Sequence, residues 1–148
     1  MGLKFTRAAD YGVRAMMHIG SLPEAGVALK DEIAVAQNIP PSFMAKILRQ
    51  LVKSGLLRST RGVHGGFGLA KPAAEISLLD IVEGIEGPIH LTDCAPDPEH
   101  CLVAHDCPVS GVWLEVQLRM TSLLRETTLE RLLSAPRKNR RAVYNIER

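Results

Sequence analysis

All three cysteines of the chain lie in one short segment, residues 93–108, with the sequence DCAPDPEHCLVAHDCP. Cys94, Cys101 and Cys107 are separated by six and five residues, and His100 and His105 stand among them. Thiolates and imidazoles are common metal ligands in proteins. An odd number of cysteines does not suit a framework of paired disulfides, which also needs an oxidising compartment. The segment therefore predicts thiolate–metal chemistry in a reduced compartment.

Charge is distributed unevenly along the chain, although the formal net charge is only +2. Between Ile33 and Ala70 there is no aspartate or glutamate, while the same stretch carries a set of cations: Lys46, Arg49, Lys53, Arg58 and Arg61. An acid-free basic stretch inside a folded region suits a polyanionic partner. The alternative interpretation is an ordinary solvated charged face.

The spacing of apolar residues predicts a mainly α-helical chain. Thr6 can cap a first helix that runs to about residue 20. A short second helix is expected over 29–37, with three residues facing inward: Leu29, Ile33 and Ala36.

The third helix, expected over about 41–54, has the clearest apolar stripe: Met44, Ile47, Leu48, Leu51 and Val52. Its other face carries the remaining residues: Ser42, Phe43, Ala45, Lys46, Arg49, Gln50 and Lys53. Residues 56–71, LLRSTRGVHGGFGLAK, predict two short strands around a glycine-rich turn at 62–66. A winged helix-turn-helix unit has the order helix, helix, turn, helix and hairpin, and the expected elements follow that order.

In such a unit the third helix lies in the major groove of DNA, and its N-terminal side chains reach base edges. Base contacts are expected from Ser42, Phe43, Ala45 and Lys46, with Arg49 or Lys53 nearer phosphate. Phe43 suits a thymine methyl group. The wing tip offers Arg61 and His64, on a backbone kept thin by Gly65 and Gly66, to a minor groove. The alternative for the tip is a plain hairpin turn with one exposed arginine.

Two more helical stretches flank the cysteine segment. Ser77 and Asp80 form a capping-box pattern for a helix that ends near residues 84–87. A long helix is expected over about 109–126, with apolar residues spaced as in a helix that pairs with another: Val109, Trp113, Val116, Met120 and Leu123. Its other sides are also apolar, which predicts a dimer helix. Thr127 with Glu130 predicts the start of a last short helix.

These patterns divide the chain into four parts. Residues 1–87 form the expected winged helix-turn-helix DNA-binding domain, and residues 88–108 form the cysteine loop. Residues 109–135 hold the dimerisation helix and a short docking helix, and residues 136–148 are a basic tail. No apolar run reaches the roughly 20 residues that span a bilayer, and no secretory signal is visible, so a cytoplasmic location is expected. Catalytic motifs are missing, so we do not expect an enzyme.

Several stretches together resemble the Rrf-two family of bacterial transcriptional regulators. They are FTRAADYGVRAMMHI, PPSFMAKILRQLVKSGLLRSTRGVHGGFGLAKP, ISLLDIVEGIEG, the cysteine segment and TLERLL, which cover about residues 3–134 in order. The resemblance implies a winged-helix domain, a long dimerisation helix, and a homodimer on double-stranded DNA with two half-sites. In the branch that includes the IscR-like and NsrR-like members, it implies an iron–sulfur cluster on the three loop cysteines.

The resemblance also bears on the fourth cluster ligand, because one chain offers only three thiols. IscR-like members use a histidine three residues after the last cysteine, and Ser110 occupies that position here. NsrR-like members can use an aspartate in the first helix, and Asp10 of ADYGVRAM matches it. Asp10 is therefore the expected fourth ligand, with His100 and His105 as rivals. The match of Asp10 favours a 4Fe–4S over a 2Fe–2S cluster. The alternative for Asp10 is a surface carboxylate paired with Arg7 or Arg14.

Two other uses of the cysteines remain open. A tetrahedral Cys3His zinc site is possible in principle, although structural zinc sites usually have closer cysteine pairs. The second alternative to a cluster is a switch in which the thiols act without any metal. On the cluster interpretation we expect a regulator, acting as a repressor, that senses nitric oxide, redox state or iron–sulfur status.

Overall fold

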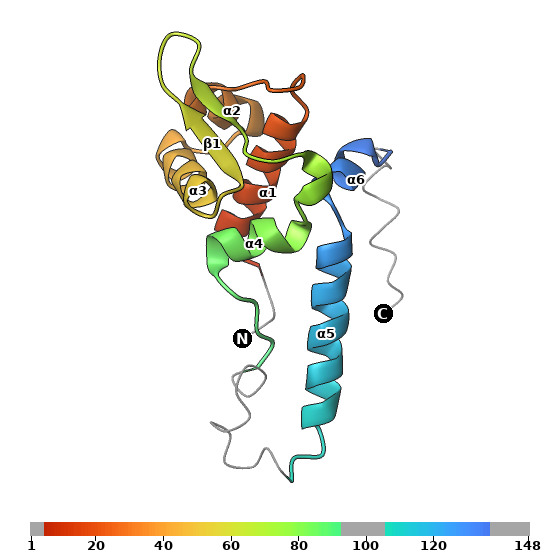
Figure 1. The fold of residues 1–148 in the computed structure, drawn as a ribbon. Helices are drawn as coiled ribbons and strands as arrows, with labels where there is room; N and C mark the ends of the chain where they lie inside the picture. Colours follow the sequence, from red (N-terminus) through yellow and green to blue (C-terminus); the bar gives the residue numbers. More distant parts are fainter. Residues whose placement is uncertain (1–4, 93–105, 137–148) are drawn as a thin grey trace.

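The computed structural model describes residues 5–92 and 106–136. Its helices and strands follow in this order: α1 Arg7–Gly20, α2 Lys30–Gln37, α3 Pro41–Lys53, β1 Leu57–Thr60, β2 Gly66–Leu69, a 3-10 turn at Ala73–Glu75, α4 Leu78–Glu86, α5 Ser110–Glu126 and α6 Leu129–Ser134. Figure 1 shows a head built from α1 to α4, the hairpin and α6, with α5 running away from it as a single long helix. The mainly α-helical winged-helix fold expected from the sequence is confirmed.

The core of the head is made by the apolar faces of α1, α3 and α4. In α3 the expected stripe is buried, since Met44, Ile47, Leu48 and Leu51 are each at most 1% exposed. Val52, the fifth residue of that stripe, is only half-buried. Burial of such side chains contributes roughly 1.5–3 kcal/mol each before entropy is counted. This burial fixes which side of α3 is left for a partner.

Helix α2 packs differently from the sequence prediction. Ile33 is buried as expected, but Leu29 is 53% exposed and Ala36 is also exposed. The reason is that Leu29 lies before the helix, with extended backbone angles, and so does not share its periodicity. Ala34 takes the second inward position instead, at 2% exposure.

The hairpin carries one pairing that the sequence did not predict. β1 and β2 pair antiparallel, with Leu57 opposite Leu69. The loop before α2 joins the same sheet, because Ala28 and Phe67 exchange backbone hydrogen bonds of 3.0 and 2.9 Å. Gly66 makes this close approach possible. Its φ is +149°, and a side chain there would lie 2.7 Å from the Ala28 carbonyl oxygen.

The ends of α4 and α6 meet in the head. Ser77 and Asp80 form the expected capping box of α4, with hydrogen bonds of 3.0 and 2.9 Å. The last helix starts one residue later than predicted: Thr128, not Thr127, accepts the N–H at its start. The Thr127 hydroxyl instead donates to the Leu123 carbonyl at the end of α5. This shift lets Leu129 turn into the core, where it is fully buried.

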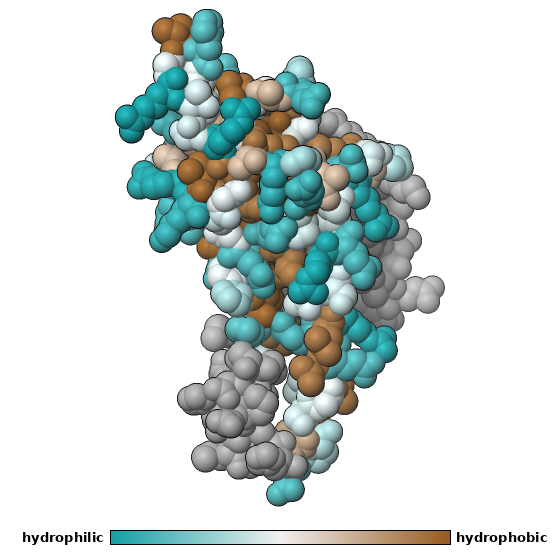
Figure 2. All heavy atoms as spheres, in the orientation of Figure 1, coloured by the Kyte–Doolittle hydropathy of each residue, from teal (hydrophilic) through white to brown (hydrophobic). Residues whose placement is uncertain are grey.

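Helix α5 has no buried residue among those the structure describes, although it is rich in apolar side chains. They are Val112, Trp113, Leu114, Val116, Leu118 and Leu123, all between 41% and 64% exposed. In Figure 2 hydrophobic residues are visible along this part of the molecule. An apolar helix that its own chain leaves uncovered is typical of an association surface. None of the described helices has the length and hydropathy needed to cross a membrane.

The buried Leu129 gives a test of how α6 contributes to the head. Leu129→Ala should lower the free energy of unfolding by about 2–5 kcal/mol, because it leaves a cavity beside Gly20 of α1. Val63→Ala is the control, since Val63 is 97% exposed and its loss should change stability by less than about 0.5 kcal/mol. Urea unfolding at one fixed protein concentration measures both. Equal stability of the two variants would mean that α6 is not part of the folded head.

Candidate nucleic-acid interface

The outer face of α3 presents most of the side chains predicted to read DNA. Ser42, Lys46, Arg49 and Lys53 are exposed, and Phe43 is 54% exposed. Ala45, also predicted to contact bases, is half-buried. These residues share one face because the stripe on the opposite side is locked into the core. The face is therefore rigid, polar and cationic.

The cations of this face are not neutralised by the head. In the described part of the chain, no carboxylate forms an ion pair with Lys46, Arg49, Lys53 or Arg61. The acid-free sequence between 33 and 70 explains this, since no acid lies on the same elements. Unpaired cations on a single face attract a polyanion such as the phosphate backbone of DNA.

Gln50 is one residue of α3 whose position differs from the sequence prediction. Its side-chain amide turns inward and donates to the Ile85 carbonyl of α4 at 3.2 Å. One of the carbonyl groups at the C-terminal end of α4 is satisfied in this way. The bond ties the recognition face to α4, so Gln50 belongs to the support of α3 rather than to its outer surface.

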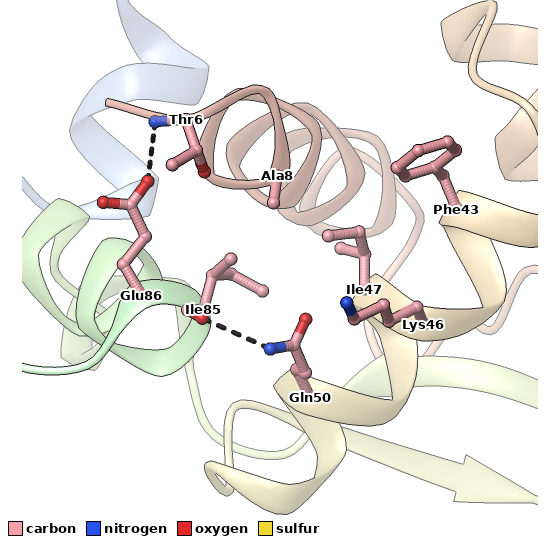
Figure 3. Close-up of a pocket in the computed structure, with 8 residues that line it drawn as sticks. All are labelled: Thr6, Ala8, Phe43, Lys46, Ile47, Gln50, Ile85 and Glu86. Atoms are coloured by element: carbon pink, nitrogen blue, oxygen red, sulfur yellow. Dashed lines mark hydrogen bonds between the residues drawn. The ribbon is translucent and has the colours of Figure 1, made fainter. Parts of the chain in front are cut away.

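A cavity of about 350 Å³ lies where α1, α3 and α4 meet (Figure 3). Its lining residues are Thr6, Ala8, Phe43, Lys46, Ile47, Gln50, Ile85 and Glu86. On one side of it, the Glu86 carboxylate accepts the Thr6 backbone N–H at 2.7 Å, which ties α4 to the start of α1. The last turn of α4 therefore contacts both α1 and α3 through hydrogen bonds to main-chain atoms.

The wing exposes two of its four predicted residues. Arg61 and His64 are exposed at the tip, whereas Gly65 and Gly66 are buried. A side chain at Gly65 would lie 2.2 Å from the Thr60 carbonyl oxygen, so only glycine suits this turn. The two glycines thus shape the turn that presents Arg61 and His64.

Arg58 belongs to the same basic stretch but is engaged within the head. Its guanidinium donates to the Leu69 carbonyl at 3.2 Å, to the Ala25 carbonyl at 3.0 Å and to the Thr60 hydroxyl at 3.5 Å. These bonds hold β1 to β2 and to the loop before α2. The sequence gives no signal for the two backbone contacts, because Leu69 and Ala25 lie 11 and 33 residues away in the chain.

The cysteine segment is described only at its borders. Cys94, Cys101, His100 and His105 lie outside the described residues. Cys107 is half-buried, and its carbonyl accepts the backbone N–H and the hydroxyl of Ser110 at 3.2 and 2.9 Å. No group of three or more potential metal ligands occurs within residues 5–92 and 106–136.

Gln117 in the middle of α5 holds the other border of this segment. Its amide donates to the Ile89 carbonyl at 2.6 Å and accepts the Leu91 backbone N–H at 2.8 Å. The Ile89 N–H in turn donates to the Glu83 carboxylate of α4 at 3.3 Å. Both borders are therefore attached to α5, at Ser110 and at Gln117, which lie roughly 10 Å apart along the helix axis.

Asp10, the predicted fourth ligand, lies on the exposed side of α1. Its carboxylate is 63% exposed and lies 3.4 Å from the Arg14 guanidinium, one helical turn away. An exposed pair of this kind contributes less than about 1 kcal/mol, so the carboxylate can change partners at little cost.

The chain is similar over most of its length to one protein family and to several of its proteins. The Rrf2 family model, described as an iron-dependent transcriptional regulator, matches residues 5–135. A protein of Mycobacterium tuberculosis named as an HTH-type transcriptional regulator is 36% identical over 134 residues, covering 86% of this chain and 79% of that protein. One of Haemophilus influenzae with the same kind of name is 31% identical over 132 residues, covering 89% and 87%. These relatives are named as regulators and not as enzymes, as expected from the sequence.

Solved structures give the same result for the fold. The structure of CymR, named as the global cysteine regulator of B. subtilis, superimposes with a TM-score of 0.76 at 26% identity, covering 90% of this chain and 98% of that one. The structure of T. potens IscR superimposes with a TM-score of 0.71 at 27% identity, covering 90% and 88%. The match over nearly the whole chain, together with the exposed face of α3 and its wing, shows that this protein belongs to the Rrf2 family of DNA-binding transcriptional regulators.

Proposed function

We propose that the protein is a homodimeric regulator whose grip on DNA depends on an iron–sulfur cluster held by Cys94, Cys101 and Cys107. It acts as a repressor and responds to nitric oxide, redox state or iron–sulfur status. The observation that carries the proposal is the attachment of the cysteine segment. Its two borders are fixed to α5 by Ser110 and Gln117, so the three thiols belong to the connection between the head and the uncovered helix.

The DNA-reading part of the proposal assigns roles to the exposed residues of α3 and the wing. Ser42, Phe43, Ala45 and Lys46 lie in the first half of α3 and would contact base edges in the major groove. Arg49 and Lys53 lie further along the helix and would contact phosphate. Arg61 and His64 at the tip, presented by Gly65 and Gly66, would enter a minor groove.

The dimer is supported by the apolar surface of α5. Six large apolar side chains of this helix are more than 40% exposed, and a second copy of α5 would cover them. Trp113, Val116, Met120 and Leu123 follow the spacing of a paired-helix seam. A symmetric dimer of two heads would bind two half-sites, which gives the operator its two-fold arrangement.

The donor set suits a cluster. Three thiolates on one segment, with one further oxygen or nitrogen ligand, match what iron–sulfur clusters require. Cys107 lies just before the N-terminus of α5, where the helix dipole favours negative charge. When bound, a cluster supplies a centre that reacts with nitric oxide or oxygen. A 4Fe–4S form is favoured, with Asp10 as the fourth ligand and His100 and His105 as rivals.

For Asp10 to act as a ligand, its carboxylate has to leave Arg14. The pair is exposed and its atoms are 3.4 Å apart, so separation costs little. In a dimer, Asp10 of one protomer would serve the cysteine segment of its partner.

The chain has a direct connection from the cysteine segment to the head. Gln117 and Glu83 hold the two backbone polar groups of Ile89, one from α5 and one from α4. Ligation of the thiols would hold this border in one arrangement and thereby set the spacing of the two heads. A regulator of this kind biases two arrangements that differ by a few kcal/mol.

Anaerobic purification tests the metal assignment directly. We expect a brown protein with iron and sulfide and no stoichiometric zinc, whose visible spectrum distinguishes 4Fe–4S from 2Fe–2S. Cys101→Ala should remove the iron and sulfide and reduce operator affinity by roughly tenfold or more, since a ligand is lost. Val103→Ala, a change in the same segment that removes no metal-ligating group, is the matched control and should keep both.

Two other outcomes of these measurements would contradict the cluster, and two more would change the assignment of its ligands. Stoichiometric zinc without colour would mean a structural Cys3His site. A metal-free protein whose DNA affinity follows oxidation of the cysteines would mean a thiol switch, and a solved neighbour of the same fold is named as the oxidised form of S. aureus CymR. Cluster content unchanged by Cys101→Ala would remove the ligand assignment. Asp10→Ala with full iron and sulfide would transfer the fourth-ligand role to His100 or His105.

The dimer can be tested by placing a charge on the seam of α5. Trp113→Glu should give a monomer in sedimentation velocity and weaken operator binding by on the order of 100-fold, because the second half-site no longer adds avidity. Ser122→Glu is the control, since Ser122 lies with Glu115 and Arg119 on the polar side of the helix. A dimeric Trp113→Glu with normal affinity would show that another surface forms the interface.

The two wing arginines should behave differently. Arg61→Ala should weaken DNA binding and lower the slope of log affinity against log salt by about one, because a contact to DNA is lost. Arg58→Ala should leave that slope unchanged and destabilise the head by roughly 1–2 kcal/mol, since Arg58 bonds to backbone groups of the hairpin. If Arg58→Ala lowers the salt slope and Arg61→Ala lowers stability, Arg58 is the DNA contact and Arg61 supports the hairpin.

A further inference from the structure

Phe43 is the one aromatic side chain on the outer face of α3, and its ring is supported by α1. The ring centroids of Phe43 and Tyr11 lie 6.2 Å apart, with the ring planes at 78°. This is the edge-to-face arrangement that aromatic pairs prefer. Figure 3 shows Phe43 on the first turn of α3, on the side of the cavity where α1 runs. Phe43 therefore has one side on Tyr11 and one side open to a partner.

Tyr11 itself is well placed to hold this position. It is half-buried and packs against the hydrophobic core, which restricts the movement of its ring. The Arg14 guanidinium lies 5.6 Å from the Tyr11 ring centroid, within the range of a cation–π contact. The contact of Tyr11 with Phe43 does not depend on whether Asp10 pairs with Arg14. Tyr11 and Arg14 of α1 form a support in which Tyr11 touches the recognition helix.

A side chain fixed in advance binds more favourably than one that must be ordered on binding. Phe43 is more than half exposed, and without a neighbour it would sample several rotamers. Contact with Tyr11 restricts that sampling before DNA arrives, and so removes part of the ordering cost. An apolar ring held in one place can then distinguish thymine, with its methyl group, from bases that lack one.

We propose that Tyr11 is a positioning residue for DNA reading, which acts by holding the Phe43 ring against a thymine methyl group in each half-site. This inference rests on the DNA-reading role assigned to Phe43 above. The ring of Tyr11 carries the effect and the phenolic hydroxyl is not needed. Tyr11→Phe therefore preserves the function, and Tyr11→Leu keeps apolar volume in the core but removes the ring.

The test starts from an operator selected by the wild-type protein out of a pool of random DNA duplexes. Each thymine of one half-site is then replaced by uracil, which removes the methyl group alone. For the wild-type protein, one of these replacements should weaken binding about fourfold, the value of one buried methyl group. Phe43→Ala should abolish that penalty. Tyr11→Leu should reduce it, and Tyr11→Phe should retain it.

A double-mutant cycle separates positioning from a general structural role. Tyr11→Leu should weaken operator binding by roughly two- to tenfold in the wild-type background, the range of an aromatic pair. In the Phe43→Ala background it should have no further effect. A purely structural role would weaken binding equally in both backgrounds, and far-UV circular dichroism of each variant reports whether the fold is kept.

The outcomes separate this inference from the function on which it rests. If the wild-type protein selects no particular sequence from the random pool, Phe43 does not read DNA and the inference is lost with that role. The same holds if Phe43→Ala binds the operator with normal affinity. A normal uracil penalty in Tyr11→Leu, or an equal loss in both backgrounds of the cycle, would overturn the inference alone.

Discussion

The burial of one apolar stripe of α3 is the contact on which the rest of this structure depends. Met44, Ile47, Leu48 and Leu51 are held between α1 and α4, and none of them is more than 1% exposed. Because a helix has only one stripe at this spacing, burying it decides which residues face outward. The polar and cationic face and its aromatic side chain follow from that single packing arrangement. A recognition surface built in this way is as rigid as the core behind it.

Side chains that bind backbone groups hold α4 to its neighbours and to the segment that leads to the cysteines. Gln50 binds the Ile85 carbonyl in the last turn of α4, and Glu86 in that turn binds the Thr6 N–H at the start of α1. Glu83 of α4 binds the Ile89 N–H, and Gln117 of α5 binds backbone groups of Ile89 and Leu91. Backbone partners fix the path of the chain, whereas pairs of long surface side chains can rearrange freely. The segment between α4 and the cysteines is therefore part of a defined joint. In the proposed mechanism, a change at the thiols would reach α4 through Gln117 and Glu83.

Local patterns in the sequence predicted much of this, and long-range contacts account for the misses. The stripe of α3 and the caps at Thr6 and Ser77 depend on residues within one or two turns, so spacing alone revealed them. Gln50 was expected on the outer face of α3, but its partner Ile85 lies 35 residues away in the chain. Arg58 is exposed, yet its guanidinium bonds to the Ala25 carbonyl 33 residues away, a contact that local spacing does not reveal. The prediction of the inward face of α2 was wrong because the helix begins after Leu29. The proposed ligand roles of the cysteines rest on the chemistry of thiolates, and Cys94 and Cys101 lie outside the described residues.

The place of α6 has a consequence for the order in which the protein can form. Leu129 completes the core against α1, and its backbone N–H bonds to the Ile76 carbonyl just before α4. The head is thus closed by residues that a ribosome makes only after the cysteine segment and α5. A nascent chain that stops short of α6 lacks a finished core, so an isolated DNA-binding head is not produced early. Synthesis therefore delivers the DNA-reading surface and the segment that would regulate it as one unit.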